Sequence, residues 1–308
     1  MANTIIYHVH GNIKFYEQVR FSLLTLLNLL ITQQRDDYAV YIYCDRPEHL
    51  PKHPFLHYIT ITPQQLKQWC GPFEYVHRMK LEILNDATKR QLAPFIYVDG
   101  DTRWLKLPDT EFQLLRKPKA ESEKPCMFMH KYEGPLSDQL FPQYLEYFKR
   151  TGSAQLAPWK VQYEALRIWN AGVIGMPAQQ AQTFFTDALA INDLLFPHLH
   201  PRNFVEQCAV GLLATNHFEV HSFEQCLHHY WDHSYAASLY LKQFFKNLDA
   251  TLSLEKQAAF CANAPWDTKA IKQLQEAPMV LISRWFGKLK NSFYKRRIDL
   301  KLAKFKFK

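Results

Sequence analysis

Two aspartates separated by one glycine, Asp99 and Asp101 in the stretch "IYVDGD", have the spacing of a chemical site. They follow a run of apolar and aromatic residues that is typical of a buried strand. Residues i and i+2 of a strand point to the same side, and Gly100 between them lets backbone and ligand approach closely. Two such carboxylates suit Mg²⁺ or Mn²⁺, hard cations that prefer oxygen ligands and often share them with phosphates. The structural alternative is that one aspartate caps the next helix while the other is solvated.

The elements that position this pair alternate along the first hundred residues. Strands are predicted at 4–10, 38–44, 57–62 and 94–98, and helices at 15–32, from 63 onward and at 75–91. Such alternation predicts a mostly parallel α/β sheet flanked by helices, in which ligands gather beyond the carboxyl ends of the strands. Residues 8–12, Asp45 and residues 99–101 all lie at such ends, so we expect a shared site there.

The rest of the chain continues the pattern and then becomes helical. Strands are predicted at 126–130, 167–176 and after residue 216, and helices up to about residue 150, at 177–195, at 204–216 and to about residue 277. The sequence contains no internal repeat or linker before its tail. We therefore expect one domain over 1–283, with a helical C-terminal part, and a separate basic aromatic tail over 284–308.

Composition narrows the class of protein. The 308 residues are 47% hydrophobic and 21% charged, as in ordinary globular proteins. Six scattered cysteines without a CxxC pair indicate reduced thiols. The start has no signal-peptide pattern, and the longest apolar run, "FSLLTLLNLLI", is too short to cross a bilayer. These features predict a cytoplasmic protein.

The net charge of +8 belongs to the tail. Residues 284–308 hold ten Lys/Arg against one acid, whereas the rest of the chain holds 27 basic and 28 acidic residues. The tail also places Trp285, Leu289 and Phe293 at i, i+4 and i+8. Interleaved cations and aromatic residues suit an anionic membrane surface. A solvated, disordered tail and nucleic-acid binding are the alternatives; for the neutral body we expect no nucleic-acid partner.

Several residues near the predicted strand ends could bind a ligand. "HRMK" places Arg78 and Lys80 at the start of a helix, where a cation could hold Asp99 or a diphosphate; the alternative is a surface ion pair. His8 and Gly11 lie at the end of the first strand. Tyr7 could meet a nucleotide base, although most such tyrosines are packing residues.

Two later stretches also combine polar groups with unusual local sequence. In "WNAGVIGM", Asn170 offers a donor and an acceptor beside Gly172 and other small residues, which leave room for a ligand or, alternatively, for a tightly packed strand. Glu206 starts a predicted helix, where a carboxylate is favoured electrostatically in any case. Its functional alternative is to bind a ligand hydroxyl or to take a proton.

Four stretches in order resemble the GT-A glycosyltransferases, and within them the glycogenin-like branch. They are "IYVDGDT", "WNAGVIGM", "VEQCAVGLL" and "HHYW", within residues 1–233. The resemblance implies a Rossmann-like GT-A fold, and it implies that Asp99, Gly100 and Asp101 form a metal-binding DxD motif. A haloacid-dehalogenase-type phosphatase is the rival for "VDGDT", but Thr102 falls one place early for that motif.

The resemblance also implies roles for residues in the later stretches. Asn170 and Gly172 would line the donor-sugar pocket, and Glu206 and Gln207 would form the acidic-Gln segment. A late histidine would complete the metal site. His228, His229 and His233 crowd within six residues, and we expect His229 to be the ligand because it precedes a Tyr-Trp pair, as in the resembling motif.

The sequence therefore predicts a metal-dependent glycosyltransferase using Mn²⁺ or Mg²⁺. It would move a sugar from a nucleoside-diphosphate sugar to a hydroxyl of a glycan or lipid-linked glycan, peripherally at the inner face of a bacterial membrane, in cell-surface polysaccharide synthesis. The glycogenin resemblance implies retention of configuration; a base role for Glu206 would imply inversion. The alternative from another class is a non-catalytic nucleotide- or glycan-binding protein of the same fold.

Overall fold

A computed structural model describes residues 2–117, 123–137, 139–269 and 271–272. Seven strands form one sheet in the order β3-β2-β1-β4-β7-β6-β8. The bounds of these strands are β1 Asn3–Val9, β2 Tyr38–Cys44, β3 Leu56–Thr60, β4 Phe95–Val98, β6 Cys126–Pro135, β7 Arg167–Met176 and β8 Glu219–Ser222. Four of its six strand pairings are parallel, while β7 runs antiparallel to both of its neighbours. The predicted mostly parallel α/β sheet is confirmed.

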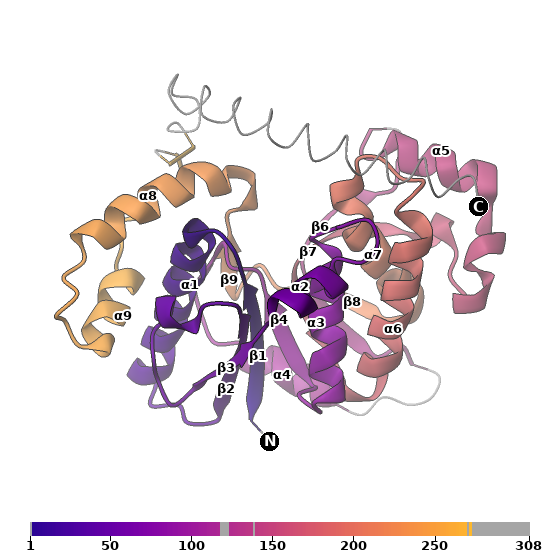
Figure 1. The fold of residues 1–308 in the computed structure, drawn as a ribbon. Helices are drawn as coiled ribbons and strands as arrows, with labels where there is room; N and C mark the ends of the chain where they lie inside the picture. Colours follow the sequence, from indigo (N-terminus) through magenta and orange to yellow (C-terminus); the bar gives the residue numbers. More distant parts are fainter. Residues whose placement is uncertain (1, 118–122, 138, 270, 273–308) are drawn as a thin grey trace.

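Helices cover both faces of this sheet (Figure 1). Their bounds are α1 Ile13–Thr32, α2 Pro63–Trp69, α3 Arg78–Lys89, α4 Asp109–Arg116, α5 Pro142–Thr151, α6 Ala178–Leu195, α7 Val205–His217, α8 Ser234–Asn247 and α9 Leu254–Ala262. The buried side chains form two clusters, one on the side of α1, α8 and α9 and one on the side of α3, α6 and α7. The helical C-terminal part is confirmed by α8 and α9, within the described residues.

Alternation along β1 and β4 assigns their side chains to the two clusters. Ile5 and Tyr7 of β1 pack on the α1 side, whereas Ile6 packs on the α3 side. Tyr97 of β4 also belongs to the α3 side. Because side chains of a strand alternate with period two, His8 and Asp99 continue the α3-side rows of these two strands.

A second, two-stranded sheet was not predicted. It pairs β5 Thr102–Trp104 with β9 Leu227–His229 in antiparallel register, and Thr102 lies opposite His229. The backbone N–H of Tyr230 extends this pairing by donating to the carbonyl of Asp101 at 3.1 Å. This small sheet therefore brings the late histidines to the two aspartates.

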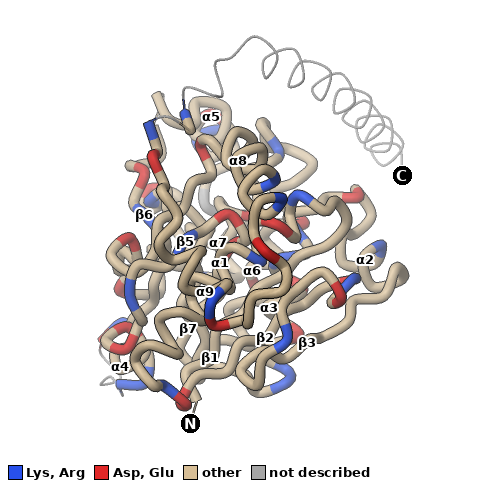
Figure 2. The backbone as a smooth tube through the Cα atoms, turned by 90° about the vertical axis from the view of Figure 1, so that its left-hand side faces the viewer, with Lys and Arg blue, Asp and Glu red and all other residues tan. Residues whose placement is uncertain are grey.

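Several predicted features of the chain can be placed directly. All six cysteines lie within the described residues, and none of them forms a disulfide. Acidic and basic residues are interspersed over the body (Figure 2). Among the described residues, no helix has both the length and the apolar character needed to span a bilayer. The predicted tail, 284–308, lies outside the described residues.

Candidate functional site

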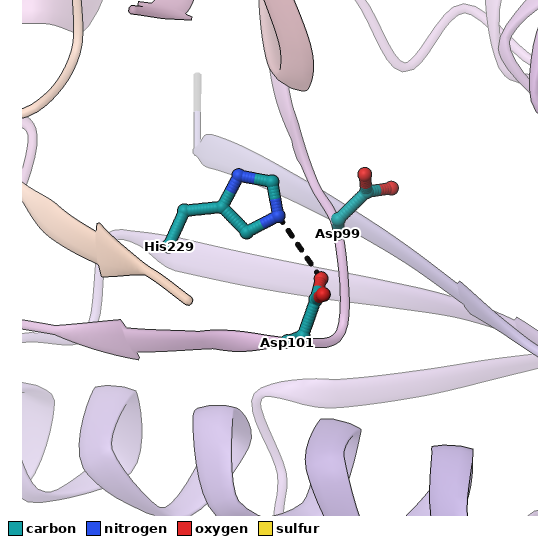
Figure 3. Close-up of side chains that lie close together, drawn as sticks. All are labelled: Asp99, Asp101 and His229. Carbon is teal, nitrogen blue, oxygen red and sulfur yellow. Dashed lines mark hydrogen bonds and ion pairs between the residues drawn. The ribbon is translucent and has the colours of Figure 1, made fainter. Parts of the chain in front are cut away.

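Asp99, Asp101 and His229 come together at the carboxyl edge of the sheet (Figure 3). One potential ligand atom from each residue lies within 4.8 Å of the other two. Nε2 of His229 is 3.1 Å from Oδ1 of Asp101, and the two residues are 128 positions apart in the sequence. The side chain of His229 is 3% exposed and that of Asp101 is 19% exposed. The three predicted metal-ligating residues therefore form one cluster.

The two glycines of the predicted motifs serve packing in this cluster. A Cβ on Gly172 would lie 2.2 Å from Cε1 of His229, so the imidazole occupies the space that the missing side chain leaves. A Cβ on Gly100 would lie 2.5 Å from Cγ2 of Val19, so α1 approaches the aspartate loop closely. We expected both glycines to make room for a ligand; the structure fills the space at Gly172 with His229 and the space at Gly100 with Val19.

Asp99 is held by a lysine and a tyrosine. Nζ of Lys80 lies 3.3 Å from Oδ2 of Asp99 and donates to the carbonyl of Ala171 at 3.0 Å. The hydroxyl of Tyr97 donates to Oδ1 of Asp99 and contacts Nδ1 of His8 at 2.7 Å. Both carboxylate oxygens of Asp99 are therefore oriented by side chains from α3 and β4.

Glu206 lies behind Lys80 and is buried. Its carboxylate is 3.5 Å from the ammonium of Lys80, and its side chain is only 4% exposed. Burial raises the pKa of Glu206 to about 7, although Lys80 opposes this shift. Burial alone would lower the pKa of Lys80, but the carboxylates of Asp99 and Glu206 raise it. Lys80 is thus a buried cation shared by two acids.

Asp101 and His229 shift the pKa of each other. Burial by itself would raise the pKa of Asp101, but the imidazole of His229 lowers it. Burial would lower the pKa of His229, yet Asp101 raises it above its usual value. Burial also lowers the pKa of the neighbouring His130 to about 3. His229 is therefore the imidazole that carries positive charge most readily at this point.

The donor set of this cluster fits a divalent ion. Two carboxylates and an imidazole are suitable ligands for Mn²⁺ or Mg²⁺. Nδ1 of His229 is buried and finds no hydrogen-bond partner among the described residues, as is also true of Nδ1 of His130. The two rings are in edge-to-face contact, with centroids 4.8 Å apart. Nε2 of His229 lies 3.1 Å from the carboxylate of Asp101, so Nε2 is the nitrogen placed to bind an ion together with the aspartates.

Asn170 and Gln207 meet at a third residue, Glu133. Nδ2 of Asn170 donates to one oxygen of the Glu133 carboxylate at 3.2 Å, and Nε2 of Gln207 donates to the other at 3.0 Å. Oδ1 of Asn170 accepts from the backbone N–H of Gly172 at 2.9 Å. Glu133 therefore fixes the orientation of both amides that the sequence had singled out.

A large cleft adjoins the cluster. Its volume is about 1630 Å³, and His229, His130 and Glu133 line it. Neither Asp99 nor Asp101 is among the described residues that form its wall, so the cleft borders the cluster through the imidazole of His229. Such a volume exceeds the roughly 300–1,000 Å³ of a typical small-molecule site. The cleft has room for more than one small ligand.

Two predicted binding residues have other partners. Arg78 donates to Asp193 at 2.7 Å and to Glu82 at 2.7 Å, so it forms the ion pairs of the alternative prediction and does not hold Asp99. Two residues correspond to about 200° of helix rotation, so Lys80 faces the site when Arg78 faces away. Tyr7 is fully buried on the α1 side of the sheet, with its hydroxyl 2.9 Å from that of Ser22, and cannot reach a nucleotide base.

The remaining predicted residues lie near the end of β1 or in the late histidine group. The backbone N–H of Gly11, whose φ is +76°, donates to the carboxylate of Asp45 at 3.3 Å. His233 pairs with Asp232, and the centroid of the His228 ring lies 6.3 Å from that of Trp266. Of the three histidines, the cluster with Asp99 and Asp101 contains His229. The structure thus brings His229, and neither of its two neighbours, to Asp99 and Asp101.

Sequence reasoning missed Glu133, His130 and Tyr97. Tyr97 lies two residues before Asp99, so its position on the same side of the strand was a usable signal. Glu133 and His130 lie on β6 next to β7, where Lys131 pairs with Asn170. That pairing is a tertiary fact, and no spacing within the sequence indicates it.

Comparisons with known proteins add a similarity of fold. No protein-family model matches this sequence, and no curated protein matches it. The fold is similar to that of galactosyltransferase LgtC in complex with donor and acceptor sugar analogs, with TM-score 0.43 and 10% identity, covering 70% of this chain and 72% of that chain. It is also similar to that of mouse xyloside xylosyltransferase 1 in its apo form, with TM-score 0.48 and 11% identity, covering 72% and 85%. At these values the likeness is one of chain architecture.

Proposed function

We propose that this protein is a metal-dependent glycosyltransferase that moves a sugar from a nucleoside-diphosphate sugar to a hydroxyl of a glycan or lipid-linked glycan. The observation that carries the proposal is the cluster of Asp99, Asp101 and His229 beside a cleft of about 1630 Å³. The two carboxylates follow a strand of a mostly parallel sheet, at the edge where ligands of such sheets bind.

Asp99, Asp101 and His229 would hold Mn²⁺ or Mg²⁺. A bound divalent ion supplies a Lewis acid that stabilises the negative charge of a departing diphosphate. Lys80 and Tyr97 orient the carboxylate of Asp99. The protein therefore preorganises charge at the point where the leaving group becomes negative, and electrostatic stabilisation of this kind supplies much of the rate enhancement of many enzymes.

Asn170, Gln207 and Glu133 would place the donor sugar and the acceptor. Glu133 lines the cleft, and its hydrogen bonds to the two amides fix which of their atoms face outward. A rigid arrangement of this kind can hold reacting groups near the attack geometry. His8 and Gly11, at the end of β1, would lie along the nucleotide, since His8 is linked to Asp99 through Tyr97.

We propose retention of configuration at the transferred sugar. Inversion would require Glu206 to take the proton of the acceptor. The side chain of Glu206 is 4% exposed, pairs with Lys80 and is not among the described residues that line the cleft. A general base has to lie within hydrogen-bond reach of the proton that it removes, so Glu206 is better suited to hold Lys80 than to contact an acceptor.

The cellular place of this activity is proposed from the sequence. Residues 1–283 would form the catalytic domain, and the basic aromatic tail, 284–308, would hold it on the inner face of a bacterial membrane during cell-surface polysaccharide synthesis. Flotation with anionic liposomes, for the full chain and for a chain that ends at residue 283, tests the tail. Equal partitioning of the two chains would contradict the membrane role.

Turnover of donors tests the proposed activity. The full chain with Mn²⁺ is incubated with a panel of nucleoside-diphosphate sugars, and release of nucleoside diphosphate is measured with and without EDTA. We expect metal-dependent release that Asp101→Asn abolishes and that Asp249→Asn, an exposed control on the loop after α8, leaves intact. Tight binding of nucleotide without release from any donor would instead favour the non-catalytic binding protein.

A further inference from the structure

Exposed apolar side chains gather in the cleft next to His229. Eight large hydrophobic side chains are exposed in the described residues. Four of these eight line this one cleft, namely Val76, Leu105, Tyr132 and Trp231. Single exposed hydrophobic residues need no explanation, but a group of them in one concave surface indicates a binding site.

The two aromatic members come from different segments of the chain. Trp231 is 50% exposed and begins the short helix that follows β9, two residues after His229. Tyr132 is 42% exposed, adjoins Glu133 on β6, and its ring lies 5.3 Å from that of Trp169. An indole and a phenol are rigid, flat surfaces that cost little conformational entropy when a ligand covers them. Both are therefore suited to stack against a flat, partly apolar ligand.

Polar groups are interspersed among these apolar surfaces. Six histidines line the same cleft, namely His77, His130, His200, His228, His229 and His233. Glu133 lies beside Tyr132, and Arg103 lies two residues from Leu105. An alkyl chain would displace water from such polar groups without offering a hydrogen bond in return, which is costly on burial. A sugar ring satisfies both kinds of surface, because its faces carry C–H groups and its rim carries hydroxyls.

We propose that this cleft binds an oligosaccharide acceptor of at least two rings, which stack on Trp231 and Tyr132. The proposal rests on the proposed function, of which it specifies the acceptor. The volume of about 1630 Å³ supports it, because one small ligand fills roughly 300–1,000 Å³. The continuity of the cleft with His229 places the end of such a chain at the metal cluster.

Binding of defined sugars tests the proposal without requiring turnover. The full chain with Mn²⁺ is titrated by calorimetry with gluco-, galacto- and N-acetylglucosamine oligosaccharides of one to four rings. In at least one series we expect the affinity to rise about tenfold or more from one ring to three. Trp231→Ala should weaken that binding by about tenfold, the factor that corresponds to a stacking contact of roughly 1.4 kcal/mol. Phe260→Ala, a similarly exposed aromatic residue on α9, is the matched control and should change nothing.

The outcomes separate this inference from the proposed function. Equal affinity for one and three rings, no binding by any series, or an unchanged affinity in Trp231→Ala would overturn it. Preferential binding of farnesyl phosphate, weakened by the same variant, would also overturn it, because a lipid chain would then cover the aromatic side chains. Oligosaccharide binding without turnover of any donor would support the oligosaccharide site and contradict the proposed transferase activity.

Discussion

Lys80 is a buried cation between two carboxylates, and replacing it by methionine is a stringent perturbation of the site. Its Nζ lies 3.3 Å from Asp99 and 3.5 Å from Glu206. At an effective dielectric constant of about 20, unit charges at such distances attract by about 5 kcal/mol, and the desolvation of both partners offsets part of this. Removing one partner of a buried pair typically costs about 3–5 kcal/mol of unfolding free energy. We expect the loss of unfolding free energy in Lys80→Met to fall in this range at alkaline pH.

The loss should depend on pH in a definite direction. Burial already raises the pKa of Glu206 to about 7, and losing Lys80 raises it further. Near pH 6, the folded variant can therefore protonate Glu206 and avoid an unpaired buried charge. Near pH 8.5 it cannot do so without additional cost, and the loss should be larger. Urea unfolding of both proteins at the two pH values, with EDTA present, measures this difference.

A double-mutant cycle isolates the interaction. Glu206→Gln removes the charge that Lys80 compensates, so at pH 8.5 the double variant should be less destabilised than the sum of the single variants by about 1–3 kcal/mol. Lys131→Met is the control, because the Lys131 side chain is 53% exposed and its ion pair with Glu224 should contribute less than about 1 kcal/mol. A loss below about 1 kcal/mol in Lys80→Met, or a loss that is independent of pH, would refute the reasoning.

Three further predictions concern the packing and charge of the site. Gly172→Ala should displace His229, since the new Cβ would lie 2.2 Å from the ring, and should weaken Mn²⁺ binding in calorimetry by about 10–100-fold. Gly100→Ala should cost about 1–3 kcal/mol of unfolding free energy through its clash with Val19, and adding Val19→Ala should recover part of that loss. The folded-state pKa of Glu206, about 7, lies above its usual value. The wild-type protein should therefore lose stability relative to Glu206→Gln as pH rises from about 4.5 to above 7, as urea titrations would measure.

Each of these has a control and a contrary outcome. Gly175 lies on the same strand as Gly172, but a Cβ on Gly175 would lie 2.9 Å from Phe128. Gly175→Ala should therefore reduce stability without weakening Mn²⁺ binding. Unchanged Mn²⁺ affinity in Gly172→Ala would contradict the role of His229. If the losses of unfolding free energy in Val19→Ala and Gly100→Ala simply add in the double variant, the clash with Val19 is not the cause of the loss in Gly100→Ala. A stability difference between the wild type and Glu206→Gln that does not vary with pH would contradict the raised pKa.

The local sequence was sufficient to predict much of the scaffold. The strands at 38–44 and 167–176 were predicted with the bounds that β2 and β7 have, because long apolar runs between turn residues identify buried strands. The position of Asp99 and Asp101 at a strand end follows from the same signal. The sequence did not predict β5 and β9, because each of these strands has only three residues and so shows little periodicity.

Tertiary contacts decided which residues form the site. Pairing of β5 with β9 selects His229 from three nearby histidines, and the phase of α3 selects Lys80 over Arg78. The neighbouring strands β6 and β7 bring Glu133 to Asn170. A sequence pattern specifies the face and type of an element through a period of a few residues. Contacts between residues far apart in the chain depend on how those elements pack, and a local period carries no information about that.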